Sequence, residues 1–183
     1  DFDNTHADIE IVLYLNKLNR QALEQGGRVI MLYGNHEFLN ISGNVDYVSK
    51  KSSEIFENYV DNKLPDKKFK NDREARRHAF APGNEYAKIL ACTHVPIVII
   101  GKNLFVHGGF LKIGINNKND LDNFDHIIRQ WVLGLIKTVD PNIFGENGPF
   151  WTREYSRIPN NLPLTDEKCG KFVELMNIFD ING

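Results

Sequence analysis

The sequence predicts an α/β fold, in which helices alternate with buried strands. Apolar residues at helical spacing run from Ala7 to Gln25, and the apolar run from Arg28 to Tyr33 follows them. Two strand patterns then stop abruptly, one at Gly34-Asn35-His36-Glu37 and the other at His107-Gly108-Gly109. In open α/β sheets, ligands and chemistry collect where strands end. The two motifs are therefore the first candidates for a functional site.

The first predicted helix has one apolar face and a clear end. Its apolar residues follow helical spacing, and Gly26-Gly27 ends the pattern. The uninterrupted apolar run that follows is typical of a strand buried on both faces. We expect the helix to join this strand to an earlier one that precedes residue 1, which would make a βαβ unit. The residues of the apolar face are Ile11, Leu15, Leu18 and Ala22.

The next segment, residues 49–82, reads as a helical and charged insertion or cap within a single domain over residues 1–183. A helix is expected from Ser49 to Asn62. The charged stretch from Asp61 to Arg77 is interpreted as a solvated linker or cap.

The remaining elements are two strands and three helices. Residues 85–92 predict a short helix, and Val95–Ile100 and Asn103–Val106 predict a hairpin around Gly101-Lys102. An amphipathic helix is expected from Asp120 to Val139, and a last helix begins at Thr165 with a plausible cap. The candidate core contacts of the amphipathic helix are Phe124, Ile127, Ile128, Trp131 and Leu135.

Composition argues against several function classes. A hydrophobic fraction of 42% and a charged fraction of 25% are ordinary for one globular domain. The net charge of -2 disfavours nucleic acid as a partner. No apolar run approaches the roughly 20 residues of a membrane span. Cys92 and Cys169 lack metal-type spacing and are interpreted as reduced, buried thiols, which favours a reducing intracellular compartment. Heavy use of Asn, Ile and Lys fits an AT-rich genome, such as that of a large DNA virus or a protist.

The side chains at the two strand ends suit a metal site. Asn offers a carbonyl oxygen and His an imidazole nitrogen, and both bind divalent metals. The adjacent glycines let the backbone turn tightly and leave room for an ion. Taken singly, Asn35 is better explained as a turn former and His107 as a hydrogen-bonded core residue; it is the two motifs together that favour a metal site.

The motifs resemble those of the calcineurin-like metallophosphoesterases, the superfamily that includes the serine/threonine phosphoprotein phosphatases. Residues 34–37 are similar to the central motif of that superfamily and residues 107–109 to a later one. Residues 35–48, with a Tyr47-Val48 pair, resemble the Shewanella-like protein phosphatase branch, as does the Trp-containing segment of residues 148–155. The resemblance implies a four-layer, α+β-like fold, a β-sandwich flanked by helices.

The resemblance also implies that the sequence is the middle of a longer protein, with N- and C-terminal portions missing. One metal motif of the superfamily would precede Asp1, and its final His ligand would follow Gly183. The Asp3-Asn4 pair fits the end of another motif, in which the superfamily usually has Asp-Arg. Asn4 thus stands where a phosphate-binding Arg is usual, which weakens that contact with substrate.

By resemblance, the site is a binuclear metal centre. Asn35 and His107 would be ligands of one ion in a centre of two divalent ions (Mn, Fe or Zn), and a metal-bound hydroxide would attack phosphorus. His36 is similar to the general acid that protonates the departing oxygen. Asp3 would orient the imidazole of His36; its alternative role is a helix cap. Arg153 would grip the phosphate, or it is a surface side chain with its stem over Trp151 or Tyr155.

For other polar residues near the motifs, the sequence leaves more than one role open. Asn40, Gly43 and Asn44 either shape the mouth of the substrate site or are plain turn residues, and Glu37 is expected to brace the loop. His94 is expected in the core or on the surface more than at the site. For the remaining histidines, His6, His78 and His126, a solvated face is expected.

The function that the resemblance implies is metal-dependent hydrolysis of a phosphoester, carried by a phosphoprotein or by a small molecule. The alternative is a degenerate, non-catalytic phosphatase fold with a binding or structural role, which Asn4 favours. A nucleotide-binding domain without hydrolysis is disfavoured, because the sequence has no Gly-rich phosphate loop of either common type. No feature of the sequence indicates an oligomeric state.

Overall fold

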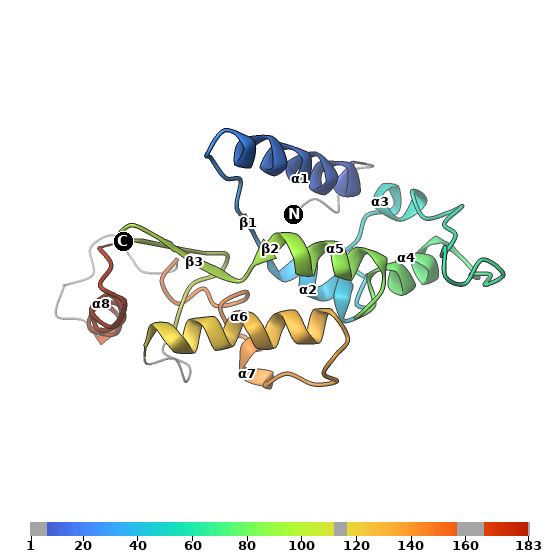
Figure 1. Ribbon diagram of the computed structural model, residues 1–183. Coiled ribbons are helices and arrows are strands. Elements are labelled where there is room, and N and C mark those ends of the chain that lie inside the picture. The colour runs from blue at the N-terminus through green and yellow to red at the C-terminus, as the bar shows by residue number, and fades with distance from the viewer. Residues whose placement is uncertain (1–6, 112–116, 157–166, 183) are drawn as a thin grey trace. The chain divides into compact units, whose positions relative to one another are not determined.

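The computed structural model describes residues 7–111, 117–156 and 167–182 of the chain (Figure 1). The described residues combine helices with two small sheets of two strands each, as expected for a mixed α/β chain. The four-layer β-sandwich stays a prediction. The chain divides into two compact units, one of residues 1–31, 36–94 and 132–135 and the other of residues 32–35, 95–131 and 136–183.

The first unit is built mainly of helices. An aromatic cluster forms its core, in which Phe80 lies 6.1 Å from Phe56 and 5.2 Å from Tyr86, between ring centroids. The helices are α1 (Asp8–Glu24), α2 (Asn35–Ile41, of which Asn35 belongs to the second unit), α3 (Lys50–Glu54), α4 (Asp72–Phe80) and α5 (Glu85–Thr93).

The helix expected from Ala7 to Gln25 is confirmed as α1. It ends because Gly26 adopts a φ of 75°, a conformation that glycine reaches at no steric cost. The amide of Gly27 then donates to the carbonyl of Ala22 at 2.8 Å, which satisfies an otherwise unpaired carbonyl of the last turn.

The strand expected from Arg28 to Tyr33 is shorter than predicted. Strand β1 contains only Met31–Leu32 and pairs with β2 (His94–Val95). The amide of Val29 donates at 3.0 Å to the side chain of Asn19 in α1, so the start of the apolar run is bound by a helix and not by a neighbouring strand. Beyond β1, the amide of Tyr33 donates to the carbonyl of Val95 at 3.0 Å.

The charged stretch from Asp61 to Arg77 was expected to be solvated, and this interpretation is wrong for its second half. Residues from Asp72 onward form α4, and Arg76 within it is only 2% exposed. The helix forms because Asn71 caps it and Ala75 and Ala79 bury one face. The helix expected over residues 49–62 is limited to α3.

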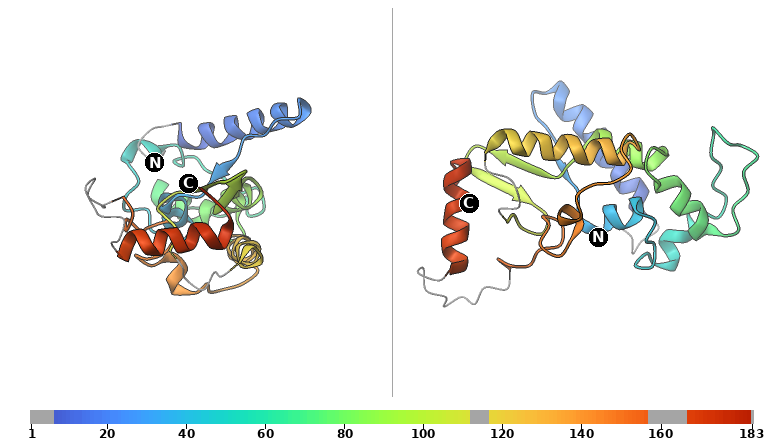
Figure 2. Two further views of the ribbon diagram at one scale, coloured as in Figure 1. Left: turned by 90° about the vertical axis from the view of Figure 1, so that its left-hand side faces the viewer. Right: turned by 90° about the horizontal axis from the view of Figure 1, so that it is seen from below.

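The hairpin is confirmed in the second unit. Strands β3 (Ile97–Ile100) and β4 (Asn103–Val106) pair in antiparallel register, with Ile97 opposite Val106 and Ile100 opposite Asn103. Helix α8 (Glu167–Phe179) and the residues after it lie beside this hairpin (Figure 2). The amide of Asn182 donates to the carbonyl of Lys102 in the hairpin turn at 2.7 Å.

The amphipathic helix is α6 (Lys118–Val132), seven residues shorter at its C-terminal end than the range that ended at Val139, and it is followed by α7 (Pro141–Phe144). Phe124 and Ile128 are buried as predicted. Ile127 is 39% and Leu135 64% exposed, so these two predicted core contacts are wrong. Ile127 lies about 100° around the helix from Ile128, and Leu135 lies beyond the helix end.

Two further expectations concern the thiols and the membrane. Cys92 is exposed and Cys169 half-buried, so the interpretation of both as buried thiols is wrong; each is a free cysteine. Both lie on amphipathic helices, where a single position does not reveal the face. In the part of the chain that the structure describes, no helix is both long and apolar enough to cross a bilayer.

Candidate active site

Two of the predicted metal ligands meet in the second unit. Asn35 follows β1 after Tyr33 and Gly34, and His107 follows β4 directly. The Oδ1 atom of Asn35 lies 2.9 Å from Nε2 of His107, although the two residues are 72 positions apart in the sequence. Asn35 is 8% exposed, whereas His107 is exposed, so the pair has one anchored and one accessible member.

The glycines after His107 allow a close backbone approach. The amides of Gly108 and Gly109 donate to the carbonyl of Pro149 at 2.8 and 3.3 Å. A Cβ at Gly108 would lie 2.8 Å from that carbonyl oxygen and 2.9 Å from the carbonyl carbon of Phe150. The segment of residues 148–155 therefore packs directly against residues 107–109, and only glycine fits at position 108 without a shift of the backbone.

This approach brings Arg153 next to Gly108, which follows His107 in the chain. A Cβ at Gly108 would lie 3.1 Å from Nη1 of Arg153. The same Nη1 donates to the carbonyls of Trp151 and Thr152 at 3.1 and 3.0 Å, which anchors the guanidinium. Arg153 is half-buried and held by backbone contacts, so its position beside residue 108 is built into the fold.

The remaining predicted site residues lie elsewhere. His36 is the second residue of α2 and belongs to the first unit, where its ring meets that of Tyr47 edge-on with 6.0 Å between centroids. His36 and Glu37 line a cavity of about 40 Å³ in that unit. Asp3 and Asn4 lie outside the described residues.

Asn40 is not a plain turn residue. It lies within α2, is 4% exposed, and donates from Nδ2 to the carbonyl of His36 at 2.9 Å. Its Oδ1 accepts from Nε of Arg76 at 2.7 Å. Arg76 was not predicted from the sequence as a buried residue, because it lies in a highly charged stretch. The alanine pair at positions 75 and 79 is the signal that could have revealed it, since small apolar residues at this spacing indicate a buried helix face.

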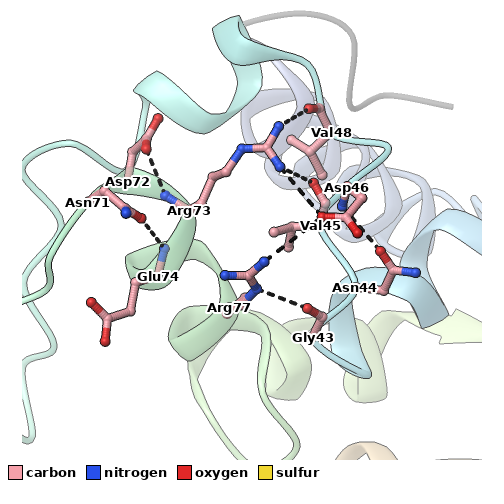
Figure 3. Close-up of polar contacts among 10 residues, drawn as sticks. All are labelled: Gly43, Asn44, Val45, Asp46, Val48, Asn71, Asp72, Arg73, Glu74 and Arg77. Carbon is pink, nitrogen blue, oxygen red and sulfur yellow. Dashed lines mark hydrogen bonds and ion pairs between the residues drawn. The ribbon is translucent and has the colours of Figure 1, made fainter.

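Helix α4 also holds the loop that follows α2 (Figure 3). Arg73 donates to the carbonyls of Val45 and Val48 at 3.1 and 3.3 Å. Arg77 donates to the carbonyl of Gly43 at 3.1 Å. Both guanidinium groups face Asp46, at 3.8 and 4.0 Å. The loop of residues 43–48 is therefore fixed by carbonyl contacts from one helix.

Two other histidines of the first unit have defined environments, His94 in the core and His78 against a carboxylate. His94 is 4% exposed, and this burial lowers the pKa of its imidazole to about 4. His94 is thus in the core, as expected. The solvated face predicted for His78 is wrong, since its side chain is only 14% exposed and its Nε2 lies 2.7 Å from Oδ2 of Asp61. The hydrogen bond from His78 is the main cause that lowers the pKa of the Asp61 carboxyl.

The chain is similar in sequence to two named protein phosphatases and to an uncharacterized viral protein. Shewanella-like protein phosphatase 1 of Plasmodium berghei is 31% identical over 171 residues, which cover 91% of this chain and 43% of that protein. Shewanella-like protein phosphatase 2 of Arabidopsis thaliana is 28% identical over 84% of this chain and 46% of its own length. An uncharacterized protein of Acanthamoeba polyphaga mimivirus is 28% identical over 93% of this chain and 72% of its own length. No family model matches the chain.

Solved structures with a fold similar to that of this chain are also those of a phosphatase. A mutant of a cold-active protein tyrosine phosphatase superposes with a TM-score of 0.68 at 22% identity, over 96% of this chain and 48% of that one. The cold-active protein-tyrosine phosphatase of a psychrophilic Shewanella species gives a TM-score of 0.60 at the same identity and coverage. The chain is a relative of the Shewanella-like protein phosphatases.

The relationship with Shewanella-like phosphatases covers nearly all of this chain but less than half of the length of the two named relatives. The solved structures likewise extend over about twice the matched length. The similarity in structure establishes the phosphatase fold.

The Asn35–His107 pair has the donor chemistry of a metal ligand set, with one oxygen and one imidazole nitrogen converging at 2.9 Å. Two ligands at right angles on one ion, with bonds of about 2.1 Å, would be separated by about 3 Å. Within residues 7–111, 117–156 and 167–182, no cluster of three or more His, Cys, Asp or Glu side chains could hold an ion. Among the described residues the pair could offer two donors to such a set, and its role as a metal ligand pair stays a prediction.

Proposed function

We propose that the protein is a metal-dependent phosphoester hydrolase of the Shewanella-like phosphatase type. The observation that carries the proposal is the 2.9 Å contact of Asn35 with His107 at the ends of β1 and β4, beside Arg153. The kinship with proteins named as phosphatases supports the same reaction class.

Asn35 and His107 would be two of the protein ligands of a binuclear centre. Mn, Fe or Zn suits a mixed set of oxygen and nitrogen donors. When bound, divalent ions supply Lewis-acid polarisation of the phosphoryl group and a lowered pKa of water. Burial of Asn35 holds its oxygen in place, and exposure of His107 leaves its imidazole within reach of solvent and substrate.

The other residues would act on the substrate directly. Arg153 would bind phosphate oxygens through its Nε–Nη2 edge, because Nη1 already donates to two backbone carbonyls. His36 would donate a proton to the departing oxygen, with Asp3 as its orienting carboxylate. Asn4 would offer a neutral and weaker contact to the phosphate than an arginine does.

The proposed substrate is a phosphoprotein. Two relatives are named protein phosphatases, and the solved structures are those of a protein tyrosine phosphatase. Small aryl phosphates share the same phosphoester bond and serve as probes of the reaction.

The first experiment combines elemental analysis of the intact protein with hydrolysis of p-nitrophenyl phosphate. About two transition-metal ions per molecule and measurable turnover are expected. Near-zero metal and no turnover after addition of Mn would instead favour the degenerate, non-catalytic fold.

Variants separate the two proposed roles. His107→Ala should lower both the metal content and turnover, whereas His36→Asn should keep the metal and lower kcat by about 10² to 10³ with phenyl phosphate, whose leaving group needs protonation. His126→Ala is the matched control, because His126 is an exposed residue of α6. A full complement of metal in His107→Ala would contradict the assigned ligand.

A further inference from the structure

A buried polar network lies beneath the helix that carries His36. Nη2 of Arg76 lies 2.8 Å from Oδ2 of Asp8 in α1, and Nη1 donates to the carbonyl of Ser52 at 2.9 Å. Nε of Arg76 donates to Oδ1 of Asn40 in α2 at 2.7 Å. The side chains of Arg76 and Asp8 are 2% and 5% exposed. One arginine of α4 thus contacts α1, α2 and α3.

Two aromatic rings also contact the guanidinium. Its central carbon lies 5.3 Å from the ring centroid of Phe56 and 4.9 Å from that of Phe80, within the range of a cation–π contact. The hydrogen bonds and the ring contacts together leave Arg76 little freedom to move. A guanidinium held in this way fixes the positions of the groups to which it donates hydrogen bonds.

Asn40 connects Arg76 to the backbone of His36. Arginine has only donors, so the carboxamide of Asn40 must turn its oxygen toward Arg76. The amide nitrogen then faces the other way and donates to the carbonyl of His36 at 2.9 Å. The orientation of Asn40 is set by chemistry, and the chain of contacts from Arg76 to the backbone of His36 has one allowed arrangement.

Packing behind His36 is incomplete. His36, Asn40, Asp8 and Arg76 all line the cavity of about 40 Å³. On the side of α2 that faces this cavity, the helix is therefore held by polar contacts as well as by packing. A buried ion pair adds little net stability compared with well-packed apolar residues, which favours a role in specifying geometry.

We propose that Arg76, acting through Asn40, is a positioning residue for His36. The inference rests on the proposed function, because it requires His36 to be the general acid. A general acid must lie within hydrogen-bond reach of the oxygen that it protonates. A small displacement of α2 would therefore cost catalysis without removing any group that touches the substrate.

The test uses the dependence of the rate on the leaving group. Phenol is a poor leaving group, with a pKa near that of tyrosine, about 10, and needs protonation; p-nitrophenol is more acidic and needs less. In the full-length protein, Asn40→Ala should lower kcat about tenfold with phenyl phosphate and less than about twofold with p-nitrophenyl phosphate. Arg76→Lys, which keeps the charge opposite Asp8 but loses the fork, should change the same ratio in the same direction.

A double variant shows whether the effect acts through His36. In a His36→Asn background, Asn40→Ala should add no further change in the ratio, since residues that act as a unit are not additive. Asn177→Ala, at an exposed position of α8, is the matched control and should leave both rates at the wild-type level. Thermal unfolding of each variant establishes that it is folded.

The outcomes separate this inference from the proposed function. Equal losses with both substrates in Asn40→Ala would indicate a merely structural role and overturn the inference alone. A selective loss in His36→Asn with no selective loss in Asn40→Ala would do the same. If His36→Asn itself showed no selectivity for the leaving group, the assignment of the general acid would fail, and the inference with it.

Discussion

Gly108 shows how a single residue can set the geometry of the candidate site. Its neighbours at 2.8 and 2.9 Å from a hypothetical Cβ are backbone atoms of residues 149 and 150. Backbone cannot rotate away as a side chain can, so any larger residue must push the two segments apart.

Gly108→Ala should lower the free energy of unfolding by about 1–3 kcal/mol, the usual cost of overpacking. Urea denaturation of the variant measures this loss. Gly170→Ala is the matched control, since Gly170 lies in α8 with no atom within 4 Å of an added Cβ. That change should stabilise by up to about 1 kcal/mol, because alanine is the better helix former. An unchanged stability of Gly108→Ala would show that the two segments are not in contact.

His94 makes stability depend on pH. Its pKa of about 4 in the folded chain lies below the ordinary value of about 6.5, because burial disfavours the charged imidazole. Between these values the unfolded chain binds a proton that the folded chain does not, so the free energy of unfolding falls as the pH falls from about 6.5 to about 4. Above about 6.5 neither state is protonated at this residue, and the effect vanishes.

His94→Gln should remove this component. Relative to the variant, the wild type should lose up to about 3 kcal/mol across the window, as measured by urea denaturation at several pH values. His126→Gln makes the same replacement of an imidazole by a carboxamide at an exposed position of α6 and is the matched control. Parallel profiles of wild type and His94→Gln would contradict the buried neutral state.

At the scale of elements, α4 organises the first unit. Its first turn is capped by Asn71, whose side chain accepts from the amide of Glu74 at 2.9 Å. Its arginines then reach α2 and the loop of residues 43–48. Fraying of α4 would therefore loosen the support of the motif that contains His36.

Asn71→Ala should cost about 1 kcal/mol in the free energy of unfolding, because the amide of Glu74 loses its acceptor. Asn71→Asp retains an acceptor at the same place and should restore most of the loss. Hydrogen exchange of the α4 amides locates the effect. A loss of equal size in the Asp variant would mean that the cap is not the cause.

At the scale of the whole molecule, the proposed metal would join two distant parts of the chain. Asn35 and His107 are 72 positions apart, and each follows a different strand. A ligand that binds only the folded state stabilises it by mass action, by about 2.7 kcal/mol at 100 times its dissociation constant.

Mn should therefore raise the Tm of the full-length protein, and a chelator should lower it. The increment should be lost in His107→Ala and kept in His126→Ala. A rise in Tm of the same size in His107→Ala would place the metal at other residues.

The local sequence pattern predicted those helices and strands whose formation depends on neighbouring residues in the chain. Helix α1 has a periodic apolar face and a glycine end, and the β3–β4 hairpin has alternating strands around Gly101. The motif residues Asn35, His107 and Arg153 were also recognised from sequence. Their roles as ligands and phosphate-binding group stay predictions.

The sequence by itself determined which residues are candidates for the chemistry and where most helices and strands occur, because residue type and periodicity are local properties. Only the tertiary structure decided that Asn35 meets His107, that Gly108 admits the segment of Arg153, and that Arg76 is buried. A charged residue is expected in water unless a specific partner compensates its desolvation. The partners of Arg76 in α1 and α2 are distant in sequence, so only the folded chain brings them together.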